Sequence, residues 1–175
     1  MAAAFVQATT GGGDGTSVVS TAFGSATTVD NKLVAWGSWD LNTVGVTSVT
    51  DSKGNTWTQR ITPFTCTSGG TRRLTMYDAP ITTGGTSHTV TLTLDGSTFD
   101  LQLNVHEVSG AGTFETSQQD AAETGTAVDC PSVTPASDGS YLVGCVRASA
   151  TTDTYAPNTG SNLWVERSSV VGPPE

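Results

Sequence analysis

Few residues in this 175-residue chain combine types and spacing that could carry acid–base chemistry. His106 is followed directly by Glu107, and a neighbouring imidazole and carboxylate could move a proton or hold a metal ion. Adjacent residues of a β-strand point to opposite faces, so these two cannot converge on one ligand unless a bulge turns one of them. We expect His106, and likewise His88, to be an outward-facing or hydrogen-bonded strand residue.

Acidic side chains near turns are the second group that could do chemistry. Asp51 with Asn55, and Asp95 with Asp100, could supply oxygen ligands to a calcium ion at the edge of a sheet. Their spacing does not match an EF-hand loop, and such residues occupy turns for local hydrogen-bonding reasons alone. We therefore expect no cofactor, with calcium as the one alternative that these residues leave open.

No catalytic motif accompanies these residues. The chain has no nucleophile-elbow, phosphate-loop, zinc-protease or dinucleotide-binding pattern. Isolated carboxylates at Glu107, Glu115 and Glu123 do not by themselves indicate a pair that cleaves glycosides. The sequence predicts a protein that is not an enzyme.

Two tryptophans on one predicted strand are candidates for binding. Trp36 and Trp39 are three residues apart, which places them on opposite faces of a strand. We expect one to lie in the core, whereas the other, with Trp39 as the candidate, could be an exposed platform for a sugar or a neighbouring subunit.

Three cysteines fit neither a disulfide scaffold nor a zinc site, because no C-x-x-C spacing occurs. A hairpin turning at residues 136–139 would place Cys130 opposite Cys145. Directly opposed Cβ atoms lie about 4.5–5.5 Å apart, slightly wider than a disulfide prefers. A bridge and two packed thiols are equally open interpretations, and Cys66 stays unpaired in both.

The elements that position these residues are strands. Threonine and serine number 32 and 18, and 20 glycines and 7 prolines add many turns. Apolar and polar residues alternate with period two, and no capped helical period appears, so we expect an all-β, antiparallel fold with almost no helix. About eleven short strands are predicted, at residues 5–6, 17–23, 32–39, 44–50, 56–61, 73–77, 88–94, 99–108, 128–133, 141–147 and 163–167.

Four details of this pattern are specific enough to test. Phe99, Leu101, Leu103 and Val105 alternate with polar residues and predict one buried face of a strand. Glycine-rich residues 11–15 predict a turn, and residues 51–55 predict a tight hairpin in which Gly54 or Asn55 has positive φ. Residues 110–126 are the longest stretch without a strand pattern and predict a functional loop.

Charge and hydropathy exclude several partners. Lysine and arginine total 7 against 16 aspartates and glutamates, a net charge of −9. Nucleic-acid binding needs clustered cations, and the only adjacent pair is Arg72–Arg73. No run of 18 apolar residues predicts a membrane span, and residues 1–7 lack the features of a secretory signal. We expect neither nucleic acid nor membrane as a partner.

Several stretches carry a likeness to a known kind of module: residues 32–36, 48–57, 76–80 with 88–94, 103–110, and 140–144. They resemble the jelly-roll-like β-sandwich modules of tailed-bacteriophage virion proteins and of secreted bacterial multidomain proteins. This resemblance implies a β-sandwich and supplies no catalytic residues. Members continue into further strands beyond the counterpart of residues 164–167. This implies either an open edge of the sheet or an edge that pairs with a neighbouring chain, and we expect the pairing.

These features together predict a phage capsid decoration or cement protein, made in the host cytoplasm and located on the virion exterior. Its expected partners are the major capsid protein and copies of itself. We expect residues 1–15 to form an arm and first strand, 16–168 the sandwich, and 169–175 a tail. Contact residues are predicted in both terminal segments: Phe5, Val6, Pro173 and Pro174.

The alternative is a carbohydrate-binding or adhesion module of a secreted or tail-fibre protein. It would bind glycans through an exposed tryptophan and the loop at residues 110–126.

Overall fold

The computed structural model describes residues 2–66, 71–118, 133–136 and 140–145. These residues form one antiparallel sheet of six strands and no helix, as the alternating pattern predicts. No helix among them is long and apolar enough to cross a membrane. The strands are β1 (Ala4–Val19), β2 (Lys32–Trp39), β3 (Val46–Asp51), β4 (Thr58–Cys66), β5 (Arg72–Pro80) and β6 (Val90–Ser109).

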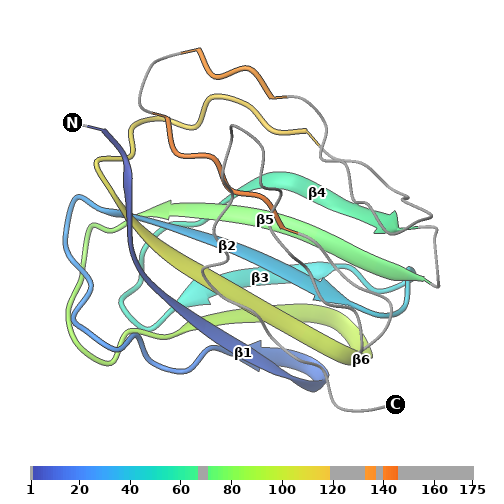
Figure 1. Cartoon of the computed structure of the whole chain (residues 1–175). Coiled ribbons are helices and arrows are strands. Elements are labelled where there is room, and N and C mark those ends of the chain that lie inside the picture. Colours follow the sequence, from blue (N-terminus) through green and yellow to red (C-terminus); the bar gives the residue numbers. More distant parts are fainter. Residues whose placement is uncertain (1, 67–70, 119–132, 137–139, 146–175) are drawn as a thin grey trace, which may run out of the picture.

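The strands run in the order β1-β6-β2-β5-β4, and β3 pairs with β6 beside this row (Figure 1). Within residues 1–108, eight predicted strands merge into these six. The segments predicted at 5–6 and 17–23 are both part of β1, and those at 88–94 and 99–108 are both part of β6. Residues 141–145 form no strand, and the remaining predicted strands lie outside the described residues.

The glycine-rich turn predicted at residues 11–15 is wrong. Gly11, Gly12 and Gly13 lie inside β1 and pair with residues 101–103 of β6. A Cβ on Gly11 would lie 2.5 Å from the carbonyl oxygen of Val19, so glycine allows the two halves of β1 to approach closely. β1 also continues across the predicted boundary at residue 15, so residues 4–15 belong to the sheet.

The turn after β3 is where the sequence predicted it, but its strands are not a hairpin. Gly54 has a φ of 77° and donates its N–H to the carbonyl of Asp51 at 3.2 Å. β3 nevertheless pairs with β6, and β4 pairs with β5. The local sequence therefore predicted the position of the turn correctly, but it predicted the pairing of β3 with β4 incorrectly.

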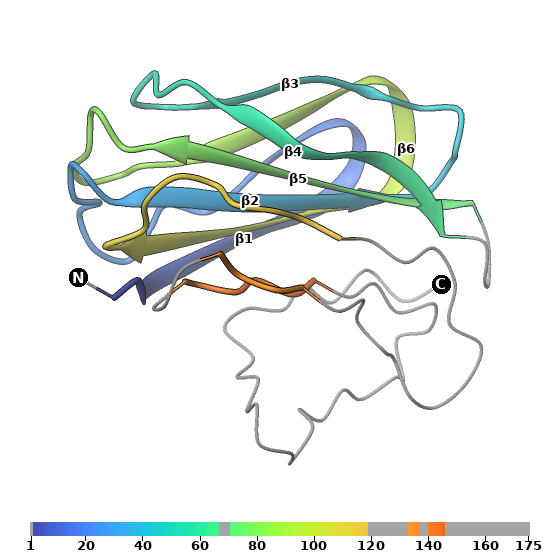
Figure 2. The ribbon, with the colours of Figure 1, turned by 90° about the horizontal axis from the view of Figure 1, so that it is seen from above.

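The hydrophobic core forms because β1 and β6 bend, so that distant parts of the sheet pack on one cluster (Figure 2). Leu33, Ala35 and Trp39 of β2 join Leu92 of β6 in this cluster. Gly37 marks the closest approach, because a Cβ there would clash with the side chain of Leu92.

The opposite face of the sheet meets the segment that follows β6. Residues 110–118 return across this face toward β4, since the Lys32 ammonium contacts the carbonyl of Gly112 and Ser117 contacts the carbonyl of Arg60. The outer edge of β4 carries Pro63 and two register shifts, features that discourage pairing with another chain.

Candidate functional site

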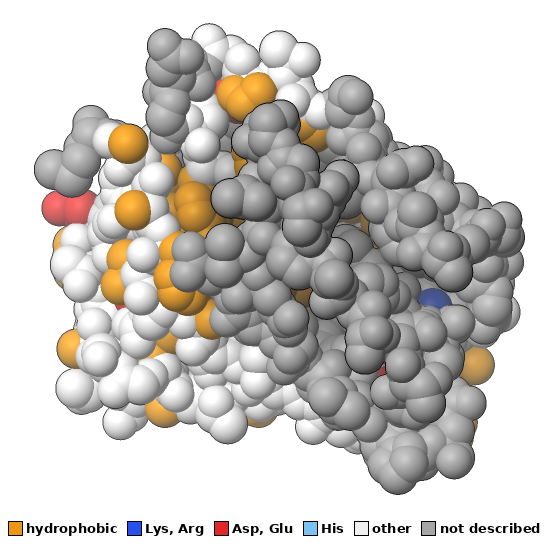
Figure 3. All heavy atoms as spheres, in the orientation of Figure 1, with side chains coloured by type: hydrophobic (Ala, Val, Ile, Leu, Met, Phe, Trp, Pro, Cys, Tyr) orange, Lys and Arg blue, Asp and Glu red, His pale blue; other side chains and the backbone are white. Residues whose placement is uncertain are grey.

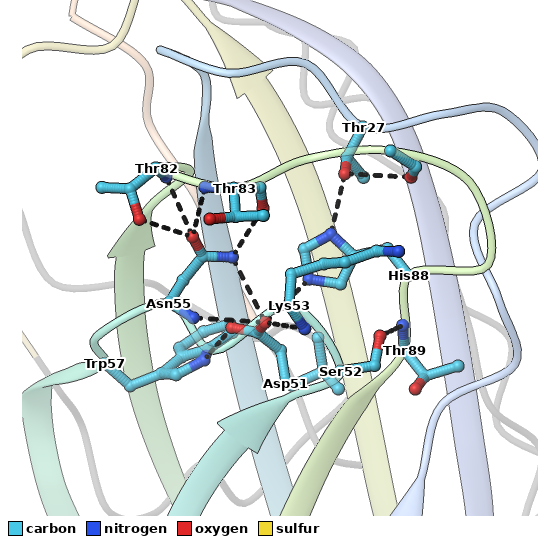
Figure 4. Close-up of polar contacts among 12 residues, drawn as sticks. Thr27, Asp51, Ser52, Lys53, Asn55, Trp57, Thr82, Thr83, His88 and Thr89 are labelled. Carbon is cyan, nitrogen blue, oxygen red and sulfur yellow. Dashed lines mark hydrogen bonds and ion pairs between the residues drawn. The ribbon is translucent and has the colours of Figure 1, made fainter.

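A buried carboxylate organises the end of the sheet at which β3 ends (Figure 4). Asp51 Oδ1 accepts the backbone N–H of Lys53 at 2.8 Å and the side-chain amide of Asn55 at 3.2 Å. Its Oδ2 accepts the indole N–H of Trp57 at 2.8 Å. Such a set of donors compensates the loss of hydration that a buried charge suffers.

His88 connects this carboxylate to another loop. Its Nε2 lies 3.1 Å from Asp51 Oδ1, although the angle is too bent for a hydrogen bond, and both side chains are fully buried. Its Nδ1 lies 2.7 Å from the hydroxyl of Thr27. Because an ionised carboxylate only accepts, it favours the proton on Nε2, so the Thr27 hydroxyl donates to Nδ1. The prediction that His88 faces outward is wrong, and the hydrogen-bonded alternative is confirmed.

Asn55 extends the same network to the loop after β5. Its Oδ1 accepts the backbone N–H groups of Thr82 and Thr83 at 2.9 and 3.0 Å, and its amide donates to the Thr83 carbonyl at 3.1 Å. The residues Thr27, Asp51, Asn55, Trp57, Thr82, Thr83 and His88, named here the buried network, therefore tie together the loops at 20–31, 52–57 and 81–89.

The order hydroxyl, imidazole, carboxylate is also that of a nucleophilic triad, but here it is closed to substrate. Thr27 is 4% exposed, and His88 is not exposed at all. An attacking hydroxyl must reach a substrate carbonyl, so this arrangement fits stabilisation of the loops.

The calcium alternative fails at Asp51, because four N–H groups and the His88 ring already surround its oxygens. Asp95 Oδ1 accepts the backbone N–H of Gly45, and Asp100 Oδ1 accepts the side chain of Gln102. Within the described part of the chain, no group of three or more His, Cys, Asp and Glu residues could hold a metal ion.

Glu107 and His106 point to opposite faces, as predicted. Glu107 is fully buried and accepts from Gln7 at 2.6 Å, from the backbone of Thr28 at 2.8 Å and from Asn31 at 2.6 Å. His106 is also buried, with its ring edge-on to Trp36 at 4.6 Å between centroids. Of the two alternatives predicted for His106, the outward-facing one is wrong, because Phe5 and Trp36 lie edge-on against its ring. The hydrogen-bonded alternative stays a prediction.

An exposed apolar surface lies at the opposite end of the sheet, where β1 and β6 bend. Phe99 is 67% exposed and Leu41 38% exposed, and we name this pair the apolar tip. The backbone N–H of Asp40 bonds the Phe99 carbonyl at 3.2 Å, and the Thr98 hydroxyl bonds the Asp40 carbonyl, so the two loops are joined.

Unusual backbone angles turn the tip residues outward. Leu41 has a φ of 77° and Asp100 a φ of 52°, both in the left-handed region that bulky residues avoid. Leu101, Leu103 and Val105 are buried as predicted. The predicted burial of Phe99 is wrong, because the left-handed Asp100 next to it breaks the alternation of side chains. Strain of this kind is found where surrounding structure enforces it, and it is a reason to look for function.

A shallow hollow of about 580 Å³ lies on the face covered by residues 110–118. Asp78, 4% exposed, lies between two cations there, with Lys32 Nζ at 3.2 Å and Arg60 Nε at 2.7 Å. The Arg60 guanidinium stacks over the ring of Phe114, 4.6 Å from its centroid.

The contact residues predicted from sequence have different outcomes. Trp39 is completely buried and donates its indole N–H to the Val44 carbonyl at 3.0 Å, so the prediction of an exposed platform is wrong. Phe5 is half-buried, and Val6 is 44% exposed at a register shift of β1. Figure 3 shows hydrophobic side chains gathered over this first half of β1.

Other predictions fall partly or wholly outside the described residues. Pro173, Pro174 and Cys130 lie outside them, and Cys145 is half-buried. The disulfide therefore stays a prediction. Of the loop predicted at 110–126, the described residues 110–118 contribute Gly112 and Phe114 to the hollow.

Sequence reasoning missed the apolar tip, the hollow and the buried network. The hollow has no local signal, because its residues come from four segments of the chain. Comparison with known proteins adds no name to these sites: no protein-family model, no curated protein and no solved structure matches the chain.

Proposed function

We propose that this chain is a non-enzymatic structural protein of a bacteriophage virion, a decoration or cement protein that stabilises the outer shell. In this proposal the bent sheet is part of a jelly-roll-like β-sandwich. The apolar tip is the observation that carries the proposal.

The tip has the chemistry of a contact surface. Phe99 and Leu41 expose apolar area next to each other at one end of a sheet whose remaining apolar residues are mostly buried. Burying a phenylalanine side chain contributes about 1.5–3 kcal/mol, and one buried aromatic anchor often dominates an interface. A shell offers many equivalent positions, so a modest contact is repeated over the whole lattice.

Charge selects the partner. Exposed carboxylates at Asp14 and Asp95 flank the tip. Asp14 accepts the backbone N–H of Asp100 at 2.9 Å, and Asp95 accepts the backbone N–H of Gly45. An acidic rim around an apolar anchor complements an apolar pocket edged by lysine and arginine. The net charge of −9 opposes a second copy of the chain at this surface and opposes packaged DNA. We therefore assign the tip to the major capsid protein.

The buried network supports this role mechanically. It fixes three loops at the far end of the sheet by hydrogen bonds among buried groups. Satisfied buried polar networks make a structure rigid, and a rigid bridge transmits load between neighbouring capsomers.

The test adds the purified protein to shells assembled from the major capsid protein of the phage that encodes it. We expect bound protein to raise the temperature at which the shells disassemble, measured by light scattering. Phe99→Ala should weaken binding about tenfold or more, whereas Val29→Ala, an exposed valine at the other end, should not.

Two outcomes would contradict the proposal: shells that do not bind the wild-type protein, or shells that bind Phe99→Ala equally well. Sedimentation velocity of the wild type and of Phe99→Ala measures whether the tip forms a dimer. A dimer that Phe99→Ala abolishes would show that the tip binds a second copy in place of a capsid protein.

A further inference from the structure

The hollow beside Asp78 has the volume of a small-ligand site, although it is shallow and open to solvent. Its volume of about 580 Å³ falls within the range of 300–1,000 Å³ usual for such sites. The ends of β2, β4 and β5 form its floor, and the segment after β6 forms one wall. Its main lining residues are Asp30, Lys32, Thr58, Arg60, Asp78 and Phe114.

Hydrogen-bond donors in the hollow are held in place by buried Asp78. Arg60 uses its Nε for Asp78, and within the described part of the chain its two terminal amino groups have no acceptor. Lys32 donates to the Gly112 carbonyl at 2.7 Å and forms an ion pair with Asp78 at 3.2 Å, so its ammonium retains donor capacity. Both cations are therefore positioned and retain donor capacity.

Acceptors and an apolar surface complete the lining. Asp30 is exposed and has a φ of 70°, and its carboxylate has no hydrogen bond within the described residues. Phe114 is 37% exposed and borders the stacked Arg60. Donors, acceptors and an aromatic ring thus surround one space.

Charge decides which class of ligand fits. Lys32 and Arg60 are balanced by Asp78 and Asp30, so the hollow is close to neutral and favours neither a phosphate nor a cation. A sugar hydroxyl donates and accepts at once, and a sugar ring offers C–H groups to an aromatic surface.

We propose that this hollow binds a neutral sugar of one or two rings. The site differs from the one that sequence analysis suggested for glycans, because Trp39 is buried and takes no part. It is also separate from the apolar tip, at the opposite end of the sheet, so the sugar site and the shell contact stand or fall independently.

The test is a titration of the soluble, isotope-labelled full chain with glucose, galactose, mannose, N-acetylglucosamine, lactose and maltose, followed by backbone amide NMR. We expect at least one sugar to bind with a dissociation constant of about 1 mM and to shift the amides of Gly112 and Thr113. Phe114→Ala and Asp30→Asn should each weaken that binding about tenfold. Phe99→Ala is the matched control and should leave it unchanged.

The variants are chosen at exposed positions, so that the fold is retained, and the amide spectrum of each reports this directly. The proposal is overturned if none of the six sugars shifts these amides, if Phe114→Ala binds as well as the wild type, or if glucuronic acid binds while the neutral sugars do not. The last result would mean that the two terminal amino groups of Arg60 recognise a carboxylate.

Discussion

The two ends of the sheet use their side chains in opposite ways. At the end with the buried network, polar groups of Thr27, Asp51 and His88 turn inward and bond one another. At the other end, Phe99 and Leu41 turn outward and acidic groups surround them. The difference separates two tasks, because the first end holds loops in place and the second presents a surface that gains stability only when something covers it.

The largest expected effect comes from removing the carboxylate of the buried network. Asp51→Ala leaves the indole of Trp57 and the Lys53 amide without their acceptor and removes the carboxylate beside the His88 ring. We expect a loss of about 3–5 kcal/mol in the free energy of unfolding, measured with urea. Asp95→Ala is the matched control near the tip. It loses one hydrogen bond, to Gly45, and should cost about 1 kcal/mol. Equal losses would remove the distinction between the ends.

A pair of phenylalanines sharpens the comparison. Phe23 is 5% exposed and lies edge-on to His88, with 5.9 Å between ring centroids, whereas Phe99 is 67% exposed. Phe23→Ala should cost about 3–4 kcal/mol because it opens a cavity, and Phe99→Ala should change the free energy of unfolding by less than about 0.5 kcal/mol. A large loss on Phe99→Ala would mean that the tip is part of the core in solution.

Features that depend on residues close together in the sequence were predicted, whereas features that depend on distant residues were not. The strand at residues 32–39 was predicted with both ends correct, because its continuous apolar run from Leu33 to Trp36 is a local property. The partner of β3 was not, because pairing with β6 joins residues about forty positions apart in the chain. Exposure of Phe99 depends on the left-handed angle of Asp100, which no periodic pattern contains.

The candidate sites follow the same rule. Asp51 and Asn55 were selected from their turn, but their role became clear only when the fold brought His88 and Thr82 to them. Both histidines are buried, which their positions in polar, strand-forming sequence did not indicate. Partners that are distant in sequence therefore decide what such residues do.

The smallest effect is expected between the two ends, at Tyr77 in β5. Burial raises the pKa of Tyr77 above its ordinary value of 10.0, and side-chain hydrogen bonds with Thr75 and Gln59 partly oppose this. The folded state holds the phenol proton more tightly than the unfolded state does. This contribution to stability is therefore complete below about pH 10 and is lost as the pH rises through the raised pKa.

Tyr77→Phe should remove this pH dependence, which urea unfolding between about pH 9 and pH 11 measures. Tyrosinate absorbance of the folded protein gives an independent titration. A steeper loss of stability in the variant than in the wild type would contradict the assignment.

Hydrogen–deuterium exchange of the full chain, alone and mixed with shells of the major capsid protein proposed as its partner, tests the central claim most directly. The account predicts slower exchange on binding at residues 40–45 and 95–100, the two segments that contain the apolar tip. It predicts no change at residues 82–89, which contain part of the buried network. Slower exchange at residues 82–89 with none at the tip would contradict it.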